Sequence, residues 1–161
     1  MGLRFIEQKH GSCFFITTSF RDHARLGDVP GVYEVLAKSL KFCVEKYKAL
    51  LPGYVFMPSH IHLMLVIEGD SLADFMRDFK KFVSQKGIRD CGVTDSYVWK
   101  YRYDRVTVYT EEIFRQKLEY IHRNPVKAGL CERDEQWGWS SASDYVTDLS
   151  SPIPVWKDWS F

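Results

Sequence analysis

The sequence predicts an α+β fold in which helices cover one face of an antiparallel sheet and one further helix is appended after it. Some segments are short runs of apolar and β-branched residues, which favour strands. In other segments apolar residues recur every three to four positions, as in helices. These segments follow one another as strand, helix, strand, strand, helix, strand, which is the order of the ferredoxin-like βαββαβ unit. With 161 residues and 45% hydrophobic content, the chain can bury a substantial core.

The first strand and the first helix are marked by their apolar patterns. Residues 13–18 are a run of apolar and β-branched side chains, which is typical of a strand. A polar loop over residues 21–31 follows, with glycine and proline as breakers. Residues 32–50 carry an apolar stripe at helical spacing, with most lysines off the stripe, and therefore predict a helix.

Two strands joined by a short turn are predicted next. Pro52 and Gly53 separate the first helix from a strand at residues 54–57. Pro58 and Ser59 then lead into an apolar, β-branched strand over residues 60–67.

Two histidines open this second strand. Because side chains alternate across a strand, His60 and His62 point to the same face. Leu63, Leu65 and Ile67 fill the opposite face as core. The strand therefore has one apolar face and one face that begins with two imidazoles.

The second helix and the last strand complete the unit. Residues 71–87 carry an apolar stripe with basic residues on its outer side, and Gly87 is the predicted end of this helix. After a loop through Gly92, residues 97–103 with 106–109 predict one bent strand or two short ones.

The appended helix carries a tyrosine and a carboxamide on one side. It begins at Thr110 and is predicted to stop at Pro125, because proline cannot continue the hydrogen-bond ladder. Tyr120 and Asn124 are four residues apart and so share nearly the same azimuth, while His122 is rotated about 200° away from the tyrosine.

Taken alone, each of these features also has a purely structural interpretation. Two histidines at this spacing can chelate a divalent metal, or they can be core residues satisfied by ordinary hydrogen bonds. Tyr120 can be a tyrosine at the edge of the core with a solvated hydroxyl. The histidine pair needs a third partner before it indicates a metal site.

Six segments carry distinctive residues in a fixed order: 15–18 (FITT), 54–63 (YVFMPSHIHL), 98–99 (VW), 103–105 (YDR), 120–130 (YIHRNPVKAGL) and 139–142 (WSSA). In content and order they resemble the REP-associated tyrosine transposases, a group of single-tyrosine HUH endonucleases similar to insertion-sequence transposases. Because these segments extend to about residue 145, we expect one transposase-like domain over residues 1–145. Residues 146–161 are expected to be a tail that packs on the domain or extends from it.

The resemblance implies a metal site and a nucleophile. His60 and His62 would bind a divalent metal, Mg²⁺ or Mn²⁺, with Asn124 as the third protein ligand. Insertion-sequence relatives generally have glutamine at the position of Asn124, and asparagine is a feature of the REP-associated group. Tyr120 would attack a DNA phosphate and leave a 5′-phosphotyrosine and a free 3′ hydroxyl. This predicts a metal-dependent endonuclease and strand transferase that acts in DNA transposition and recombination.

The implied substrate is single-stranded DNA with a hairpin, such as a repetitive extragenic palindrome, cut near the hairpin foot. Candidate DNA-binding side chains are basic residues from several parts of the chain: Arg21, Arg25, Arg77, Lys80, Lys81, Arg102, Arg105 and Arg123. A solvated charged surface is the alternative interpretation of each cluster. Both a monomer and a homodimer agree with the resemblance.

Composition agrees with this interpretation without requiring it. A net charge of +1 means that DNA contacts must come from local clusters of basic residues. The four cysteines are widely spaced, which is typical of reduced thiols and does not suggest a zinc site. The sequence has neither a signal-peptide pattern nor a membrane span, so we expect a cytoplasmic protein that is nucleoid-associated when bound to DNA.

Two other classes of function are open at this point. A non-catalytic module could bind single-stranded nucleic acid on the same sheet by aromatic stacking. A metal-dependent phosphodiester hydrolase could use the histidine pair to activate water, and Tyr120 would then be dispensable. A tyrosine and a carboxamide ligand on one helix turn argue against both alternatives.

Overall fold

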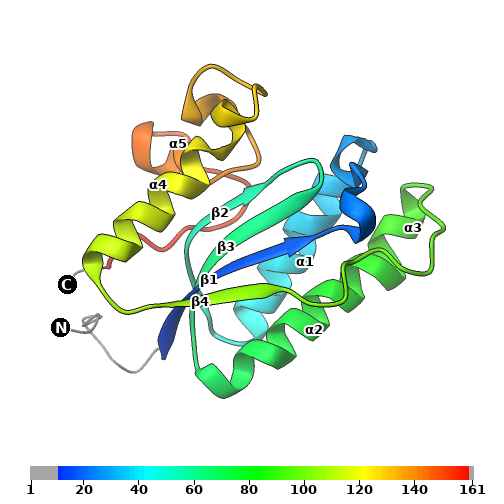
Figure 1. The fold of residues 1–161 in the computed structure, drawn as a ribbon, viewed down its shortest axis with the longest axis horizontal. Helices are drawn as coiled ribbons and strands as arrows, with labels where there is room; N and C mark the ends of the chain where they lie inside the picture. The colour runs from blue at the N-terminus through cyan, green and yellow to red at the C-terminus, as the bar shows by residue number, and fades with distance from the viewer. Residues whose placement is uncertain (1–10, 160–161) are drawn as a thin grey trace.

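A computed structural model describes residues 11–159, which form a four-stranded antiparallel sheet with helices on both faces (Figure 1). The strand order is β2-β3-β1-β4. The strands are β1 (Ser12–Ser19), β2 (Leu50–Phe56), β3 (His60–Ile67) and β4 (Asp104–Val108), and the helices are α1 (Val32–Lys46), α2 (Leu72–Phe82), α3 (Ile88–Asp90), α4 (Glu111–Lys127) and α5 (Ala142–Val146). This confirms the predicted ferredoxin-like sheet. Residues 1–10 of the predicted domain and 160–161 of the predicted tail lie outside the described residues.

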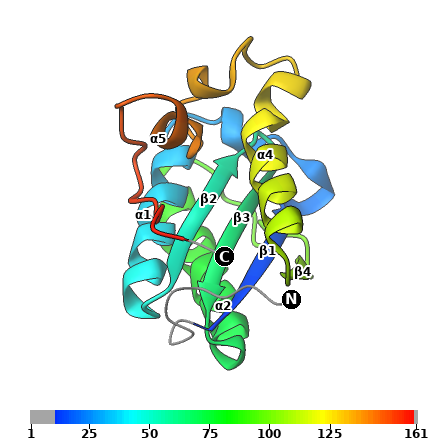
Figure 2. The same ribbon diagram turned by 90° about the vertical axis from the view of Figure 1, so that its left-hand side faces the viewer.

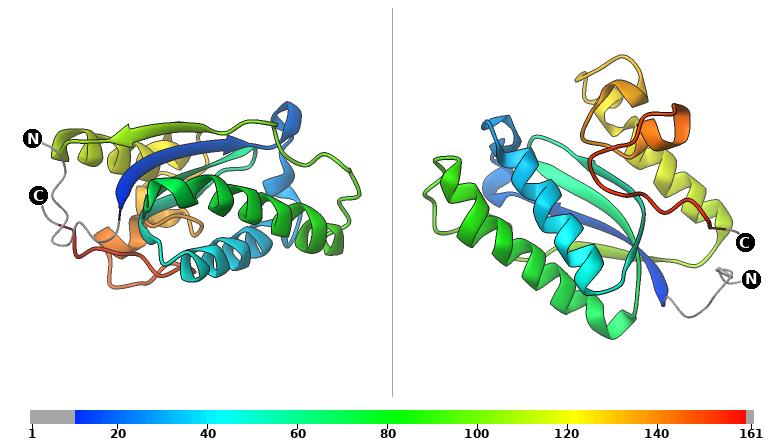
Figure 3. Two further views of the ribbon diagram at one scale, coloured as in Figure 1. Left: turned by 90° about the horizontal axis from the view of Figure 1, so that it is seen from below. Right: turned by 180° about the vertical axis from the view of Figure 1, so that it is seen from behind.

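The main core lies between the sheet and helices α1 and α2. Figure 3 shows these two helices side by side across one face of the sheet. Leu63, Leu65 and Ile67 of β3 are buried against them, together with Phe14 and Ile16 of β1. Each buried side chain of this size contributes roughly 1.5–3 kcal/mol to the free energy of unfolding. The alternation predicted for β3 is therefore present, with its apolar side facing the helices.

Helix α4 packs on the opposite face of the sheet. In Figure 2 it lies on the near side of the strands, with α2 behind them. A second apolar cluster fills this layer, with Met64 and Val66 from β3 and Phe114, Leu118 and Ile121 from α4. The histidine end of β3 lies on the same sheet face, where the ring of His62 stacks on Phe15 of this cluster and contacts Tyr120 of α4.

The sequence Pro52-Gly53 lies inside β2 and not in a turn before it, which corrects the predicted start of this strand at residue 54. The pairing of β2 with β3 shifts register between Leu50 and Gly53. A Cβ atom on Gly53 would lie 2.6 Å from Leu118 Cδ1. Glycine thus leaves room for Leu118 of α4 against β2, whereas any larger residue would require that side chain to shift.

Helix α4 runs through Pro125 to Lys127, which corrects the predicted stop at the proline. It ends in a Schellman motif, in which Gly129 N–H donates to Val126 O (3.0 Å) and Leu130 N–H donates to Pro125 O (2.9 Å). Gly129 has φ 74°, a left-handed conformation that glycine adopts without strain. The helix thus ends at a glycine cap, one turn later than the proline rule predicts.

Two other predicted boundaries also shift. Helix α1 ends at Lys46 and not at residue 50, because the chain turns through Lys48 at φ 51°. Helix α2 ends at Phe82, but a π-helical turn, Val83–Gly87, and α3 continue the helical path past the predicted stop.

None of the helices within residues 11–159 has the length and apolar character needed to cross a bilayer.

The last predicted strand region forms only one regular strand, β4. The preceding segment joins the sheet through a single bridge between Trp99 and Phe20. Their rings stack with centroids 4.8 Å apart, so Trp99 faces the main core. Between this bridge and β4 the chain is not paired with the sheet, and Tyr101 is 94% exposed and Arg102 also exposed.

The segment after α4 returns to the sheet edge and lies along β2. Phe56 N–H donates to Trp139 O (2.9 Å), and Ser141 N–H donates to Tyr54 O (3.0 Å). Further on, Ile153 is buried in the main core. The described part of the tail therefore packs on the domain.

Candidate active site

His60 and His62 lie side by side on the sheet face that α4 crosses. Their ring centroids are 4.9 Å apart with the planes at 78°. His62 is only 4% exposed, whereas His60 is half-buried. Across the β1–β3 ladder, Thr17 is opposite His62 and Ser19 is opposite His60. Strand alternation thus places two imidazoles next to two hydroxyl side chains.

A hydroxyl group holds the Nδ1 atom of each imidazole. Thr17 Oγ1 lies 2.9 Å from His62 Nδ1, and Ser59 Oγ lies 3.1 Å from His60 Nδ1. When Nδ1–H donates to the hydroxyl, the Nε2 atom of the same ring keeps its lone pair. Metal-binding histidines are usually held through the second ring nitrogen in this way.

His62 Nε2 is buried and has no hydrogen-bond partner among the described residues. A buried polar atom without a partner destabilises the fold by roughly 1–3 kcal/mol. A ligand bound at Nε2 would remove this cost, so the atom fits a metal site better than a structural core.

Both imidazoles are held in the neutral form. Burial lowers the pKa of His62 to about 3, with smaller contributions from His60 and from the positive charge of Lys117. Burial also lowers the pKa of His60, and His23 adds to the effect. A neutral imidazole is the form that binds a metal ion, so no proton has to be displaced near neutral pH.

Tyr120 reaches this pair from α4. The centroid of its ring lies 5.2 Å from that of His62, with the planes at 78°. Phe15 contacts both rings, with centroid distances of 5.5 Å to His62 and 5.9 Å to Tyr120. The tyrosine side chain is 44% exposed, so a bound substrate can reach its hydroxyl.

Lys117 is a residue of this site that the sequence analysis missed. Its Nζ atom lies 4.7 Å from the centroid of the Phe15 ring. Lys117, Tyr120 and Asn124 occupy positions i, i+3 and i+7 of α4 and so form one stripe. The same spacing that paired Tyr120 with Asn124 could have identified the lysine.

Asn124 is half-buried one turn after Tyr120. The helix stays regular at this point, since Ala128 N–H donates to Asn124 O (3.0 Å). Residues 11–159 contain no group of three or more His, Cys, Asp or Glu side chains that could hold a metal ion. An amide oxygen is a different type of ligand, and with two imidazoles it makes a nitrogen and oxygen donor set suited to a divalent cation.

His122 faces away from Tyr120 and fixes the back of α4. Its Nε2 lies 2.9 Å from Ser141 Oγ, and burial lowers its pKa to about 4. The same hydroxyl accepts a hydrogen bond from Tyr54 N–H (3.0 Å). Ser141 therefore links α4 to β2 and helps to set which stripe of the helix faces the histidines. This explains the WSSA segment, residues 139–142, as a structural anchor.

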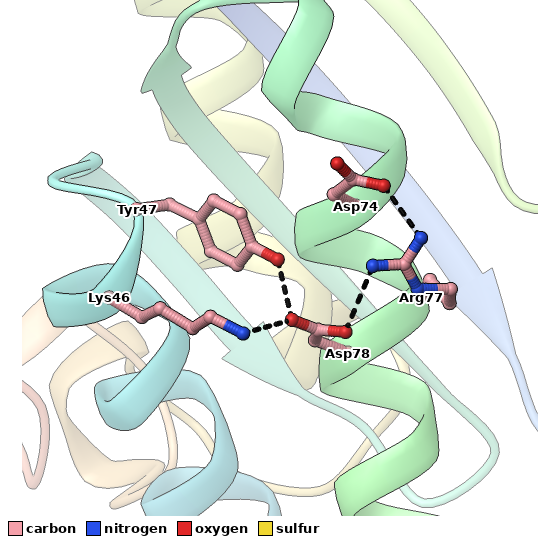
Figure 4. Close-up of polar contacts among 5 residues, drawn as sticks. All are labelled: Lys46, Tyr47, Asp74, Arg77 and Asp78. Carbon is pink, nitrogen blue, oxygen red and sulfur yellow. Dashed lines mark hydrogen bonds and ion pairs between the residues drawn. The ribbon is translucent and has the colours of Figure 1, made fainter.

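The predicted basic residue Arg77 lies on α2, across the sheet from the histidines. Its guanidinium contacts Asp74 (2.7 Å) and Asp78 (3.4 Å). Asp78 also pairs with Lys46 (2.7 Å) and accepts a hydrogen bond from the hydroxyl of Tyr47. Figure 4 shows this network joining α1 to α2. Arg77 thus has a structural role in addition to its predicted contact with DNA.

Three other predicted DNA-binding residues also lie away from the histidines. Lys80 on α2 donates to the carbonyl oxygen of Lys100 (3.1 Å), and Lys81 is exposed on the same helix. Arg105 on β4 lies 5.9 Å over the ring of Phe14, on the face covered by α1 and α2. The structure does not bring these three residues to the histidine pair.

The remaining predicted basic residues lie in the loop after β1, in the segment before β4 and on α4. Arg21 and Arg25 are exposed in the loop after β1, near the histidine end of the β1–β3 ladder. Arg102 is exposed just before β4. Arg123 lies on α4 and pairs with Asp134 (3.2 Å). The predicted DNA-binding residues are therefore spread over several surfaces and do not form one patch.

Proteins similar to this chain are known over most of its length. No family model matches the chain. A REP-associated tyrosine transposase of Escherichia coli K12 is 23% identical over 150 residues, covering 92% of this chain and 85% of the relative. A candidate REP-associated tyrosine transposase of Haemophilus influenzae is 24% identical over 159 residues, covering 92% of this chain and 88% of the relative.

Two solved structures share the fold. A REP-associated tyrosine transposase bound to a REP hairpin superposes with a TM-score of 0.72 and 22% identity, covering 94% of this chain and 90% of the other. A candidate transposase from Deinococcus radiodurans gives 0.53 and 18%, with coverage of 68% and 87%. The resemblance predicted from the six segments is confirmed, since the chain is similar to REP-associated tyrosine transposases over most of its length.

Proposed function

We propose that this relative of the REP-associated tyrosine transposases is a metal-dependent single-stranded DNA endonuclease and strand transferase. The observation that carries the proposal is the contact between Tyr120 and His62. His62 offers a buried imidazole nitrogen without a hydrogen-bond partner in residues 11–159, and Tyr120 offers an accessible phenol. Such a pair fits the transfer of a phosphoryl group to tyrosine.

The proposed substrate is single-stranded DNA that carries a hairpin. The support comes from the relatives, since one structure of similar fold is of a transposase bound to a REP hairpin. A flexible strand can also bend across a site that lies under a helix, whereas stacking in a duplex opposes such bending. The half-exposed Tyr120 leaves room for the strand to approach.

The proposed metal ligands are His60, His62 and Asn124. Neutral imidazoles and an amide oxygen fit Mg²⁺ or Mn²⁺ when substrate oxygens complete the coordination. When bound, the ion would polarise the oxygens of the scissile phosphate and so make the phosphorus more electrophilic. Thr17 and Ser59 would hold the rings through Nδ1.

In the proposed reaction, the phenolic oxygen of Tyr120 loses its proton and bonds to the scissile phosphorus. The bond between phosphorus and the 3′ oxygen breaks, and that oxygen leaves with the electron pair and takes up a proton. The products are a tyrosine linked to the DNA 5′ phosphate and a free 3′ hydroxyl. Because the phosphodiester is kept in the covalent link, another 3′ hydroxyl can reverse the attack and join strands without ATP.

One chain can supply all the residues of this site. His122 and Ser141 link α4 to β2 of its own chain, with a contact of 2.9 Å. Tyr120 thereby meets the His62 of the same chain. We therefore propose that a monomer is sufficient for cleavage, although strand transfer between two DNA ends can still use two copies.

A denaturing gel with labelled single-stranded hairpin DNA tests the proposed function. Wild type is compared with Tyr120→Phe, each with Mn²⁺ or EDTA, and Tyr109→Phe is the control because Tyr109 is an exposed tyrosine just before α4. We expect a metal-dependent covalent band in wild type and Tyr109→Phe but none in Tyr120→Phe.

Two other results would favour the alternative functions. Cleavage that persists in Tyr120→Phe without a covalent band would indicate a hydrolase that activates water. Hairpin binding on a native gel, with neither a band nor a cut product from wild type, would indicate a non-catalytic binding module.

A further inference from the structure

Lys117 brings a positive charge to the same ring that contacts both His62 and Tyr120. The three groups surround Phe15, with Lys117 Nζ at 4.7 Å and the His62 and Tyr120 rings at 5.5 Å and 5.9 Å from its centroid. The ammonium is thus part of the site although it was not among the predicted DNA-binding residues.

Contact with the aromatic ring keeps this ammonium on the sheet face. A cation over a ring is held by roughly 0.5–2 kcal/mol, and the apolar stem of the lysine can lie along the half-buried surface beneath it. The side chain is accordingly half-buried. Its charge therefore points along the face where the histidines lie and is not lost into bulk solvent.

Within residues 11–159, Lys117 has no carboxylate partner, in contrast to several other basic side chains. Arg77, Arg115 and Arg123 are paired with Asp74, Glu111 and Asp134 respectively. The lysine ammonium lies instead over the ring of Phe15, which also contacts His62 and Tyr120. Its charge is available to an anion that enters the site.

A phosphodiester is the anion that fits this place. A metal ion on His62 and the Lys117 ammonium would repel each other across the ring of Phe15 unless a negative group lay between them. The proposed reaction brings one such group to Tyr120, namely the scissile phosphate. Lysine commonly binds phosphate as a point charge.

We propose that Lys117 binds the scissile phosphate of the DNA strand and so orients it toward Tyr120. The proposal rests on the proposed function, which supplies the identity of the anion. It adds a phosphate-binding residue on α4 to the ligands on β3.

The test uses Tyr120→Phe protein, so that binding is measured without cleavage. Hairpin DNA carries one neutral methylphosphonate, either at the scissile phosphate mapped with wild type or at the phosphate on either side. Fluorescence anisotropy gives the dissociation constant in Mn²⁺ for Tyr120→Phe alone and with Lys117→Met. Lys127→Met is the matched control, because it removes one exposed lysine from the end of the same helix.

We expect Lys117→Met to weaken binding of unmodified DNA about tenfold and to reduce the salt dependence by about one phosphate contact. With methylphosphonate at the scissile position, Lys117→Met should cause no further loss. Lys127→Met should change the dissociation constant by the same factor for unmodified DNA and for each methylphosphonate DNA. Lys117→Arg should behave like lysine, which separates loss of charge from loss of folding.

The assignment would be overturned if Lys117→Met weakened binding equally with and without methylphosphonate at the scissile position. It would also be overturned if a methylphosphonate at a flanking phosphate, and not at the scissile one, removed the effect of Lys117→Met. In either case a covalent band from wild type would leave the proposed function intact. Failure of Tyr120→Phe protein to bind any hairpin DNA would overturn both proposals.

Discussion

The two faces of β3 differ sharply although their residues alternate along one strand. Leu63 and Leu65 are fully buried under α1 and α2. The neighbouring His62 faces α4, with an imidazole nitrogen that no described group satisfies. One face packs in the main core and the other carries the proposed site, and because side chains alternate with a period of two, adjacent residues lie on different faces. Substitutions at neighbouring residues should therefore affect different properties.

The largest effect is expected on the face that carries the chemistry. His62→Ala removes a proposed metal ligand, and we expect the rate of covalent adduct formation in Mn²⁺ to fall roughly 1000-fold, because a metal contributes several kcal/mol to phosphoryl transfer. The protein should stay folded, since the unpartnered nitrogen is lost with the ring. Quantitative gels and thermal melts measure the two properties. An adduct rate equal to that of wild type would refute the role of His62.

The next residue should show the opposite pattern. Leu63→Ala leaves a cavity under α1 and α2, and we expect the free energy of unfolding to fall by about 3 kcal/mol. Urea denaturation measures this loss. At a temperature where the variant is folded, adduct formation per folded molecule should match wild type. Loss of adduct with unchanged stability would contradict the separation of the two faces.

A smaller effect is expected from the hydroxyl that holds His62. Thr17→Val removes the contact with Nδ1, and Mn²⁺ affinity should fall about 10- to 100-fold. Isothermal titration calorimetry measures the affinity directly. Thr18→Val is the matched control, because its buried hydroxyl has no partner among the described residues and the side chain is on the other face. Equal losses in both variants would argue against a specific role for Thr17.

The smallest effect is expected between α1 and α2. Hydrogen bonds from Lys46 and Tyr47 hold the pKa of Asp78 at about 2, below its ordinary 3.8. Because this pKa is lowered by folding, its stabilisation is complete above about pH 4 and is lost as pH falls toward 2. Asp78→Asn should lower the melting temperature by about 5 °C at pH 7. The difference in melting temperature between wild type and Asp78→Asn should be similar at pH 7 and pH 4 and smaller at pH 2.5. A difference that stays the same at all three pH values would contradict this role of Asp78.

The sequence predicts the features that depend on local period. Alternation in β3 predicts the shared face of His60 and His62, and helical spacing predicts the common stripe of Tyr120 and Asn124. These relations need only the geometry of one element. The order of elements was likewise enough for the sheet topology.

Features that depend on contacts between distant segments could not be predicted in this way. Gly53 was interpreted as a turn residue, but its role comes from the approach of Leu118 on a helix far along the chain. The contact between His122 and Ser141 and the position of Lys117 over a β1 side chain also require the folded arrangement. Each of these depends on how α4 docks on the sheet, which no local pattern encodes.

The proline in α4 illustrates a local rule that gives way to its surroundings. Pro125 is buried within the helix, and the chain continues to a glycine cap. Burial of the helix face and the Schellman motif offset the missing hydrogen bond. The result keeps Asn124 inside regular helix, where it shares the stripe of Tyr120.

The proposed nucleophile is tested most directly by identifying the residue that carries DNA after reaction with a hairpin substrate in Mn²⁺. The adduct would be isolated under denaturing conditions, digested with nuclease and protease, and mapped by mass spectrometry. We expect a 5′-phosphotyrosine at Tyr120 alone. Modification of Tyr97, Tyr101 or Tyr109, which are more exposed, would contradict the proposed role of the face shared by α4 and the histidines.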